Sequence, residues 1–512
     1  MPKTLQLLQQ EVTYSAAKED QSNILHKLTF VPQRNKFLNH VYQHRHLIEA
    51  TVSHHLNLRS GETCQVSQPD EWLHGSFNLC IPVHIGKSGR ALKKRVLIRF
   101  PLPYRVGEAF RSGNSDEKLR CEAGTYAWLQ QKCPSVPIPR LYGFGLSTGQ
   151  CFTAVENMPF FSRCFHYLRC RLLAFLGYQT PTRYVPHPNC IPRDLGTGYL
   201  LIDFIEDGQM LSNTWSEKHG EERLRKNLFR DLSKILLTLS RVPLPRIGSF
   251  IIDADGYLSL TNRPLSSEIH ELENEHIPVD MPRGFTYSTV DSYVVDLLSC
   301  HDSRMQHQPN AAMDLKDCIY QVTALTMMRT IFPHFFQREL RRGPFVLQLT
   351  DLHPSNIFVD DDWNIRCVID LEWACSRPIE MLHPPTWLTN QPVDKIDLEL
   401  YNKVREEFMG ILQDQEKVLH AKAGHTTSLS SVMEKGWKTR TFWYSICLRS
   451  PLGIHQLFYD RIQTRFADGH IDDGDFFRII MNYWREGAIP FMHEKVKDKE
   501  QYDLQLQEAF ED

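Results

Sequence analysis

Three polar residues near the middle of the chain have the types and the spacing of a phosphoryl-transfer site. Asp351 stands five residues before Asn356, and Asp370 follows beyond a short apolar segment, an acidic turn and a second apolar segment. A carboxylate in the position of Asp351 can accept or orient the proton of an attacking hydroxyl. An amide oxygen and a second carboxylate are ligands that magnesium prefers. We therefore predict that Asp351 is catalytic and that Asn356 and Asp370 bind the metal.

The residues between these three predict a loop followed by a β-hairpin. Pro354 and Ser355 favour a tight loop, and the apolar runs at 357–359 and 365–369 are predicted strands. The polar residues between the strands are predicted to form the turn and not to bind metal: Asp360, Asp361, Asp362 and Asn364. Protein kinases use this order of loop, hairpin and terminal Asp to bring a catalytic carboxylate and two magnesium ligands together. Two Asx-rich turns around a hairpin without catalytic function are the alternative.

The segment LTDLHPSNIFVDDDWNIRCVIDLEWA, residues 349–374, resembles the central motif of the aminoglycoside phosphotransferase and choline kinase-like family. That motif is often written HGDLHPGNIL…DW, and the variant found here is similar to phosphotransferase-family proteins of filamentous fungi. The resemblance extends over residues 68–423. It implies an α+β, bilobal protein-kinase-like fold, with a mixed β/α N-lobe and a mainly helical C-lobe. It also implies ATP and Mg2+ as cofactors, and a hydroxyl or similar group that receives the phosphate.

The motif departs from the family pattern immediately before Asp351. Leu349 and Thr350 stand where the family usually has His and Gly. That His supports the geometry of the loop and is not the base, so the departure bears on the rigidity of the loop and not on its chemistry. Glu372, two residues after Asp370, either assists the magnesium ion or braces the loop.

Phosphate-binding residues are predicted in the strand-rich part before the motif. Gly75 and Ser76 occupy the place of the loop that covers the phosphates, although a single glycine is equally typical of a plain β-turn. Arg99 follows an apolar run, at the position where kinases place a phosphate-pairing Lys. A solvent-facing Arg on an edge strand is the alternative. Glu122, in the helix predicted next, is the expected partner that orients Arg99, and Glu117 is the other candidate.

The segment Tyr199–Asp207 resembles the hinge between the two lobes. The backbone around Asp203, Phe204 and Ile205 is expected to hydrogen-bond the adenine ring, with apolar neighbours on either side of it. Because backbone groups do this work, the side chains carry little signal, and Phe204 could equally belong to an ordinary core.

Apolar patterns divide the chain into four predicted regions. Short apolar runs bounded by turns predict strands at 77–85, 95–100, 141–146, 151–156 and 199–205. Helical spacing predicts helices at 116–132, 212–240 and 315–332. The regions are an N-terminal helical extension (1–67), a kinase-like N-lobe (68–207), a kinase-like C-lobe with the catalytic loop (208–423) and a C-terminal helical region (424–512).

One insertion in the predicted N-lobe, residues 157–198, has an unusual composition. Its first part, MPFFSRCFHYLRCRLLAFLGYQT, predicts a basic amphipathic helix, and its second part is a Pro-rich loop. We interpret the insertion as a packed surface element in preference to a membrane-binding or partner-binding one.

Composition and charge exclude several classes of partner. The 512 residues are enough for two or three folded units, and the formal net charge of −3 gives no electrostatic reason to expect a nucleic acid or an anionic membrane. No apolar run is long enough to span a bilayer, and the N-terminus lacks the apolar core of a signal peptide. The 13 cysteines include no CxxC pair, so we predict reduced thiols, no zinc site and a cytoplasmic location.

Two classes of function remain open. The first is an ATP- and Mg2+-dependent phosphotransferase acting on a hydroxyl of a small molecule, preferred over a protein acceptor because no APE-like end of an activation segment follows Asp370. The second is a nucleotide-binding pseudokinase or a helical scaffold, favoured by the departures at 349–350 and the long helical extensions. Three tryptophans are candidates either for a pocket that selects the acceptor or for ordinary core positions: Trp437, Trp443 and Trp484. We predict loop or core positions for His301, His307 and His353.

Overall fold

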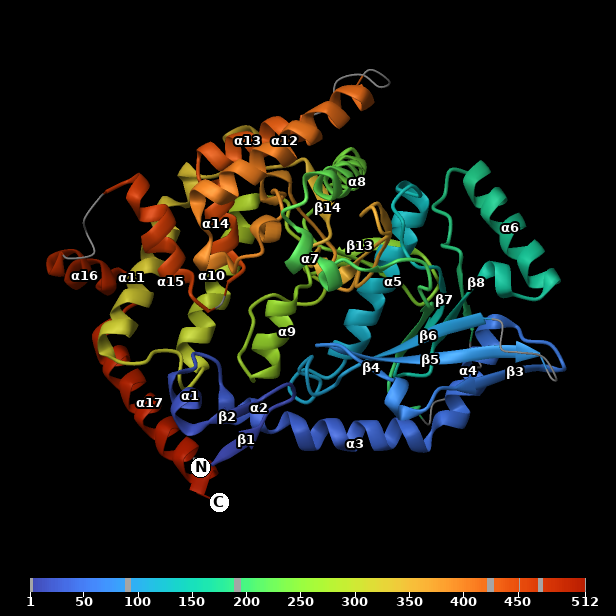
Figure 1. Ribbon diagram of the computed structural model, residues 1–512, viewed down its shortest axis with the longest axis horizontal. Helices are drawn as coiled ribbons and strands as arrows, with labels where there is room; N and C mark the ends of the chain where they lie inside the picture. Colours follow the sequence, from blue (N-terminus) through green and yellow to red (C-terminus); the bar gives the residue numbers. More distant parts are fainter. Residues whose placement is uncertain are drawn as a thin grey trace.

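The computed structural model of the chain describes residues 3–87, 94–187, 195–420, 428–450, 452–467 and 473–511. It has an α+β architecture, as predicted: an antiparallel sheet with covering helices lies beside a larger, mainly helical body (Figure 1). The middle of the predicted Pro-rich loop, 188–194, and the predicted region boundary at 424 lie outside the described residues. The three boundaries between the predicted regions stay predictions.

The N-lobe is built on this sheet. Within the described residues it has eight strands in the order β3-β5-β6-β10-β7-β8-β9, with β4 paired to β5. Their bounds are β3 (Glu62–Val66), β4 (Leu73–His74), β5 (Asn78–Lys87), β6 (Lys94–Pro101), β7 (Leu141–Gly145), β8 (Cys151–Ala154), β9 (Tyr184–His187) and β10 (Tyr199–Asp203). The five strands predicted in this region are therefore confirmed. Successive side chains of β6 alternate between the two faces, so Ile98 enters a core while Arg99 points the other way, into a cavity.

Helices cover both faces of the sheet. On one face, α3 (Phe30–Gln43) and α4 (Arg45–Leu56) pack Val41 and Val52 against strands β5 and β6. On the other face, α5 (Asn114–Lys132) packs Tyr126 against β7 and β10, which confirms the predicted helix. This arrangement fixes α5 directly behind β6, so polar residues on the two elements can meet.

The C-lobe is mainly helical, with small sheets at the motif. Its helices are α7 (Ser212–Lys218), α8 (Glu222–Ser240), α9 (Ser267–Asn274), α10 (Val290–His307), α11 (Leu315–Ile331) and α12 (Leu398–His420). Helix α11 confirms a prediction, whereas the predicted helix 212–240 is divided into α7 and α8 because the chain turns at His219–Glu221. The sheets are β11 (Gln209–Met210) with β15 (Ile357–Val359) and β16 (Ile365–Val368), β12 (Ser249–Ile252) with β13 (Leu258–Asn262), and β14 (Phe345–Gln348) with β17 (Cys375–Pro378). The last two pairs were not predicted.

The two ends of the chain pack together (Figure 1). The N-terminal elements are β1 (Thr4–Gln6), β2 (Glu11–Thr13), α1 (Tyr14–Glu19) and α2 (Ile24–Leu28). The C-terminal ones are α13 (Leu429–Lys438), α14 (Thr441–Leu448), α15 (Ile454–Leu457), α16 (Gly474–Ile480) and α17 (Ala488–Glu511). Helix α17 is joined to the N-terminus by the Tyr502 hydroxyl, which accepts a hydrogen bond from the Ile24 N–H (2.8 Å). The C-lobe core includes the three tryptophans that were candidates for either a pocket or the core: Trp437, Trp443 and Trp484.

The predicted amphipathic helix in the insertion forms, but it does not pack as expected. Helix α6 (Phe160–Phe175) lies at the edge of the molecule beyond β8 (Figure 1). The side chains of Phe161 and Phe175 are 84% and 87% exposed, and His166 is the buried residue among those of the helix that the structure describes. The interpretation as a packed surface element is therefore wrong for α6, because its apolar stripe faces solvent and not the sheet.

Two further predictions concern the oxidation state of the cysteines and the presence of membrane-spanning helices. Cys151 is disulfide-bonded, so the prediction of uniformly reduced thiols is wrong at this residue, while eleven other described cysteines are free. Among the residues that the structure describes, no helix is both long enough and apolar enough to cross a membrane.

Candidate active site

A cavity between the two lobes collects the predicted site residues. Its volume is about 540 Å³, within the range of small-molecule sites. The N-lobe, the hinge and the catalytic motif each contribute residues that line it: Gly75, Ser76, Arg99, Asp203, Phe204, Ile205, Asp351, Asn356 and Asp370. Glu122 lies behind Arg99 and contacts it. The structure thus places together all ten residues to which the sequence assigns a role in catalysis or in cofactor and metal binding.

The catalytic loop holds Asp351 and Asn356 against each other. The Asn356 amide Nδ2 donates to the Asp351 carbonyl (2.9 Å) and to its carboxylate Oδ2 (3.0 Å). The hairpin of β15 and β16 then returns the chain, and the Ile369 N–H donates to the Asn356 carbonyl (3.0 Å). This bond places Asp370, the next residue, at the same wall of the cavity.

The loop is braced in spite of its departure from the family pattern. The Thr350 hydroxyl donates to the carbonyl oxygen of Trp373 (2.7 Å), which ties the start of the loop to the segment after Asp370. The indole N–H of Trp387 donates to the Leu352 carbonyl (2.8 Å). Two side-chain bonds to backbone carbonyls therefore hold the loop where the family uses a His.

The environment of Asp351 disfavours its charged form. Burial, followed by repulsion from Asp370 and Glu372, raises the pKa of the Asp351 carboxyl to about 7. The bond from Asn356 acts in the opposite direction. A carboxyl group with such a pKa can take up a proton near neutral pH.

Arg99 is the centre of a buried ionic network. Its guanidinium Nη1 donates to Glu122 (2.7 Å), and Nη2 donates to Asp370 (2.5 Å) and to Glu372 (3.0 Å). Strand β6 lies between β5 and β10, and the Arg99 side chain is 4% exposed, so the edge-strand alternative is wrong. Glu117, the other candidate partner, instead binds Arg263 (2.8 Å).

Sequence reasoning missed one member of this network, Lys118. Its Nζ donates to Glu372 Oε2 (2.6 Å) and to Asn78 Oδ1 (2.6 Å). Burial opposes ionisation of Glu372, but the charges of Lys118 and Arg99 outweigh it and lower the pKa of this carboxyl. Lys118 precedes Glu122 by four residues on α5, and this spacing on a predicted helix was the available signal. The contacts of Glu372 are those of a brace between the lobes.

The predicted phosphate loop and hinge have well-defined backbone geometry. The Gly75 N–H donates to the Asn78 carbonyl (2.9 Å), so this segment is a β-turn between β4 and β5 that also lines the cavity. In the hinge, the Asp203 N–H already donates to the Arg140 carbonyl (3.0 Å). Phe204 and Ile205 are therefore the better candidates for bonds to an adenine ring.

The donor set around the cavity fits a magnesium ion. Because the Asn356 Nδ2 points at Asp351, its amide oxygen is directed elsewhere, with a long contact (3.5 Å) from the Ser355 hydroxyl. The Asp370 carboxylate, 32% exposed, supplies a second oxygen ligand. In the described part of the chain no group of three or more His, Cys, Asp or Glu could hold a metal alone. One or two protein oxygens supplemented by phosphate and water are the usual surroundings of Mg2+.

A comparison with family models identifies the part of the chain that carries the motif. Residues 154–381 match the model of the phosphotransferase enzyme family. This segment, less than half of the chain, is therefore similar to that family. The match to the phosphotransferase family covers the hinge and all three residues of the motif, whereas Arg99 and Glu122 lie before it.

Comparisons with individual proteins are less informative. An ethanolamine kinase of Plasmodium vivax, a solved structure, is similar with 14% sequence identity and a TM-score of 0.35 over 87% of this chain and 90% of that chain. No curated protein matches the chain significantly.

Proposed function

We propose that this protein transfers the γ-phosphate of ATP to a hydroxyl of a small molecule, with Mg2+ as the cofactor. The observation that carries the proposal is the interlobe cavity, where Asp351, Asn356 and Asp370 face the same space as Arg99 and the hinge. Four separate parts of the chain supply the residue types that phosphoryl transfer requires: the turn at 75–76, strand β6, the hinge and the motif at 351–370.

In this proposal each part of the cavity has one task. The backbone of Phe204 and Ile205 binds adenine, and the turn at Gly75 and Ser76 covers the phosphates. Arg99, held by Glu122, presents positive charge to the phosphates. Asn356 and Asp370 hold magnesium, which supplies neutralisation of the phosphate charge.

Asp351 receives the proton in the proposed reaction. It hydrogen-bonds the acceptor hydroxyl and accepts its proton as the acceptor oxygen bonds to the γ-phosphorus. The bond from that phosphorus to the oxygen bridging to the β-phosphate breaks, and ADP leaves with the bonding pair. The protein forms no covalent bond, so its contribution is positioning and electrostatic stabilisation.

One observation favours the second candidate, nucleotide binding without turnover. The ion pair between Arg99 and Asp370 (2.5 Å) engages a carboxylate that the first candidate assigns to magnesium. In an active enzyme this pair must rearrange when nucleotide and metal bind.

The cytoplasmic location and the small-molecule class of the acceptor stay predictions.

The variant Asp351→Asn tests the proposal, because it keeps the shape of the side chain and removes its basicity. With a panel of alcohols, sugars, amino alcohols and hydroxy acids, we expect the wild type to release ADP. The variant should release it about 100-fold more slowly while its ATP affinity is retained. Asp361→Asn, in the exposed turn of the hairpin, is the matched control. Unchanged turnover in Asp351→Asn would refute the assigned role, and ATP binding without ADP release in the wild type would support the second candidate.

A further inference from the structure

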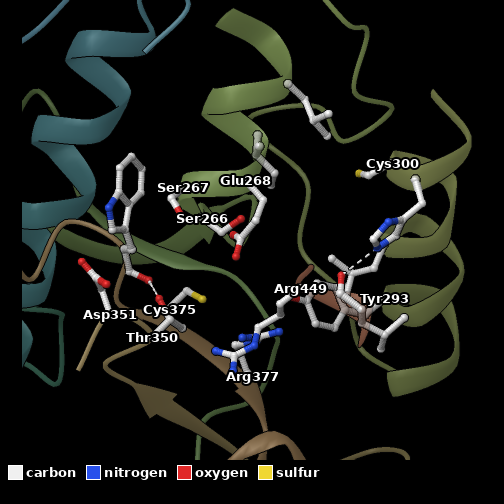
Figure 2. A pocket seen from close by; sticks show the side chains of 16 residues that line it. Ser266, Ser267, Glu268, Tyr293, Cys300, Thr350, Asp351, Cys375, Arg377 and Arg449 are labelled. Carbon is white, nitrogen blue, oxygen red and sulfur yellow. Dashed lines mark hydrogen bonds between the residues drawn. The ribbon is translucent and has the colours of Figure 1, made fainter. Parts of the chain in front are cut away.

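A second cavity opens on the far side of Asp351 (Figure 2). Its volume is about 140 Å³, smaller than a site for a drug-sized ligand. It shares Ser267, Asp351 and Trp373 with the interlobe cavity, so the catalytic carboxylate lies where the two cavities meet. A phosphoryl donor in one cavity and an acceptor in the other would both reach Asp351.

Arg377, on β17, is a buried cation without a counter-ion in this second cavity. Its residue is 4% exposed, and its Nε has no hydrogen-bond partner. Its guanidinium lies 5.8 Å from the ring centroid of Tyr293, and among the described residues no carboxylate is within ion-pair distance of it. Burial disfavours this charge, but Tyr293, which hydrogen-bonds the guanidinium, and the more distant Cys375 and Glu268 outweigh burial and raise the pKa of Arg377. Arg377 is therefore a cation that a bound anion can pair with.

A second arginine, Arg449, lies beside the first. Its Nη2 bonds to His383 Nε2 (2.9 Å), and burial lowers the pKa of His383 to about 3, so this partner is neutral. Burial, followed by the charge of Arg377, lowers the pKa of Arg449 to about 10, which still leaves it charged. The carboxylate of Glu268, on α9, acts on both arginines from beyond ion-pair distance. Figure 2 shows the two guanidinium groups on one side of the cavity and Asp351 on another.

We propose that this cavity is the acceptor site, and that the acceptor carries a carboxylate or phosphate group which Arg377 and Arg449 bind. The inference rests on the proposed function and specifies its substrate class: a small hydroxy acid or a phosphorylated alcohol. Two guanidinium groups match such an anion with several charge-assisted hydrogen bonds. The hydroxyl of the same molecule then reaches Asp351. A large polycation has neither the size nor the charge for this cavity.

The test is anion binding measured with the nucleotide cavity filled. In the presence of saturating Mg2+ and a non-hydrolysable ATP analogue, we would titrate inorganic phosphate, D-glycerate and glycerol, and follow the melting temperature. We expect one of the two anions to raise it and neutral glycerol at equal concentration to leave it unchanged. Preference for glycerate or for phosphate distinguishes the two anionic classes.

Substitutions separate this inference from the proposed function. Arg449→Gln and Arg377→Met should each weaken anion binding by about 10-fold or more, while Arg246→Met, at an exposed arginine outside the cavity, should not. Arg377→Lys, which keeps the charge, should recover part of the affinity if Arg377→Met folds poorly. Equal anion affinity in all variants, or no effect of either anion, would overturn the inference. If the ATP analogue itself does not bind, the proposed function fails instead.

An independent observation concerns the exposed helix α6. Its apolar side chains at Phe161, Phe165, Leu168, Leu172 and Phe175 are each more than half exposed. Their spacing of three and four residues puts them on one face of the helix. Burial of this face was the usual expectation for such a pattern, yet the face is directed at solvent.

The charged side chains of α6 itself have a single sign. From residue 157 to residue 187 the chain has no Asp or Glu, and it has four arginines: Arg163, Arg169, Arg171 and Arg183. Arg183 pairs with Glu156, which lies just before this segment, so the three arginines of the helix itself carry the argument. At 100° per residue, Arg169 and Arg171 fall on the two borders of the apolar stripe. With 16 residues the helix is too short to span a bilayer. Arginines beside an apolar face are typical of a helix that lies in the surface of an anionic membrane.

We infer that α6 binds the surface of membranes that contain anionic phospholipids. We favour the lipid over a second copy of the chain because Arg169 and Arg171, at the borders of the apolar stripe, are complementary to an anionic surface. This revises the expectation, drawn from net charge, that membranes are not partners. The net charge of the whole chain conceals the local charge of this segment.

Vesicle co-sedimentation tests the inference. We expect binding to vesicles of phosphatidylcholine with 30% phosphatidylserine and little binding to pure phosphatidylcholine. Phe161→Ser combined with Leu168→Ser should abolish it, Arg171→Glu should weaken it several-fold, and Leu504→Ser, at another exposed apolar side chain, should not change it. No binding to anionic vesicles would overturn the inference. Self-association that is lost in the double variant would then identify a second copy as the partner.

Discussion

Replacing Arg99 by Met should destabilise the fold strongly, because it removes the one guanidinium that three acidic side chains share. Arg99 pairs with Glu122, Asp370 and Glu372 at 2.7, 2.5 and 3.0 Å, and the Glu122 and Glu372 side chains are 1% and 4% exposed. Breaking one buried ion pair costs about 3–5 kcal/mol. Lys118 stays against Glu372 (2.6 Å), so the main uncompensated charge is that of Glu122. We therefore expect a loss near this range and not a multiple of it.

The pH dependence of this loss follows from Glu122. Burial already raises its pKa to about 7 even with Arg99 present, and removal of Arg99 must raise the pKa further. A group whose folded pKa exceeds its unfolded value binds more protons in the folded state, so stability rises as pH falls. The cost of Arg99→Met should therefore be larger at pH 8 than at pH 6.

Urea denaturation followed by circular dichroism measures these differences. The matched control is Arg95→Met on the same strand, where an exposed arginine pairs with exposed Glu206 (3.0 Å) and the expected cost is about 0–1 kcal/mol. In the Arg99→Met background, Glu122→Gln should cost much less than in the wild type, since the two residues interact directly. Equal costs for Arg99→Met and Arg95→Met, or strictly additive costs for Arg99 and Glu122, would refute the reasoning.

Three further predictions concern other parts of the structure. Thr350→Val removes the bond to the Trp373 carbonyl and should cost about 1 kcal/mol and slow ADP release while ATP affinity, measured calorimetrically, is kept. Burial lowers the pKa of His55 to about 3. Below pH 6.5 this imidazole is therefore protonated in the unfolded chain but stays neutral in the folded one. His55 should therefore lower the free energy of unfolding by about 2 kcal/mol between pH 6.5 and pH 5. An equally steep fall in the free energy of unfolding of His55→Asn would contradict this. Glu117→Gln weakens the ion pair with Arg263 (2.8 Å) and should lower the midpoint of urea unfolding without changing ATP affinity. Reduced ATP affinity in this variant would show that Glu117 acts in the nucleotide site.

The local sequence was sufficient wherever one short segment carries the signal. Asp351, Asn356 and Asp370 lie within twenty residues of each other, and the hairpin between them is specified by its own turn. Arg99 was recognisable because its side chain emerges from an otherwise apolar run that predicts a strand. The structure differs little from these expectations, since neighbouring residues determine the geometry.

The remaining features depend on residues far apart in the chain. Lys118 is separated from its partner Glu372 by 254 residues, so nothing near Lys118 shows that it is buried and paired. The strand pair β14 and β17 is likewise defined by a partner and not by its own pattern. For α6 the periodicity gives the apolar stripe, but whether that stripe faces the core or the solvent depends on how the helix is attached.

The central claim is that the interlobe cavity binds ATP with magnesium held by Asp370. Calorimetric titration of ATP into the purified protein, with and without Mg2+, tests it most directly. We predict binding that requires magnesium, is weakened by about 10-fold or more in Asp370→Asn and is unchanged in Asp361→Asn. Absence of binding in both conditions, or equal binding by Asp370→Asn, would contradict the claim.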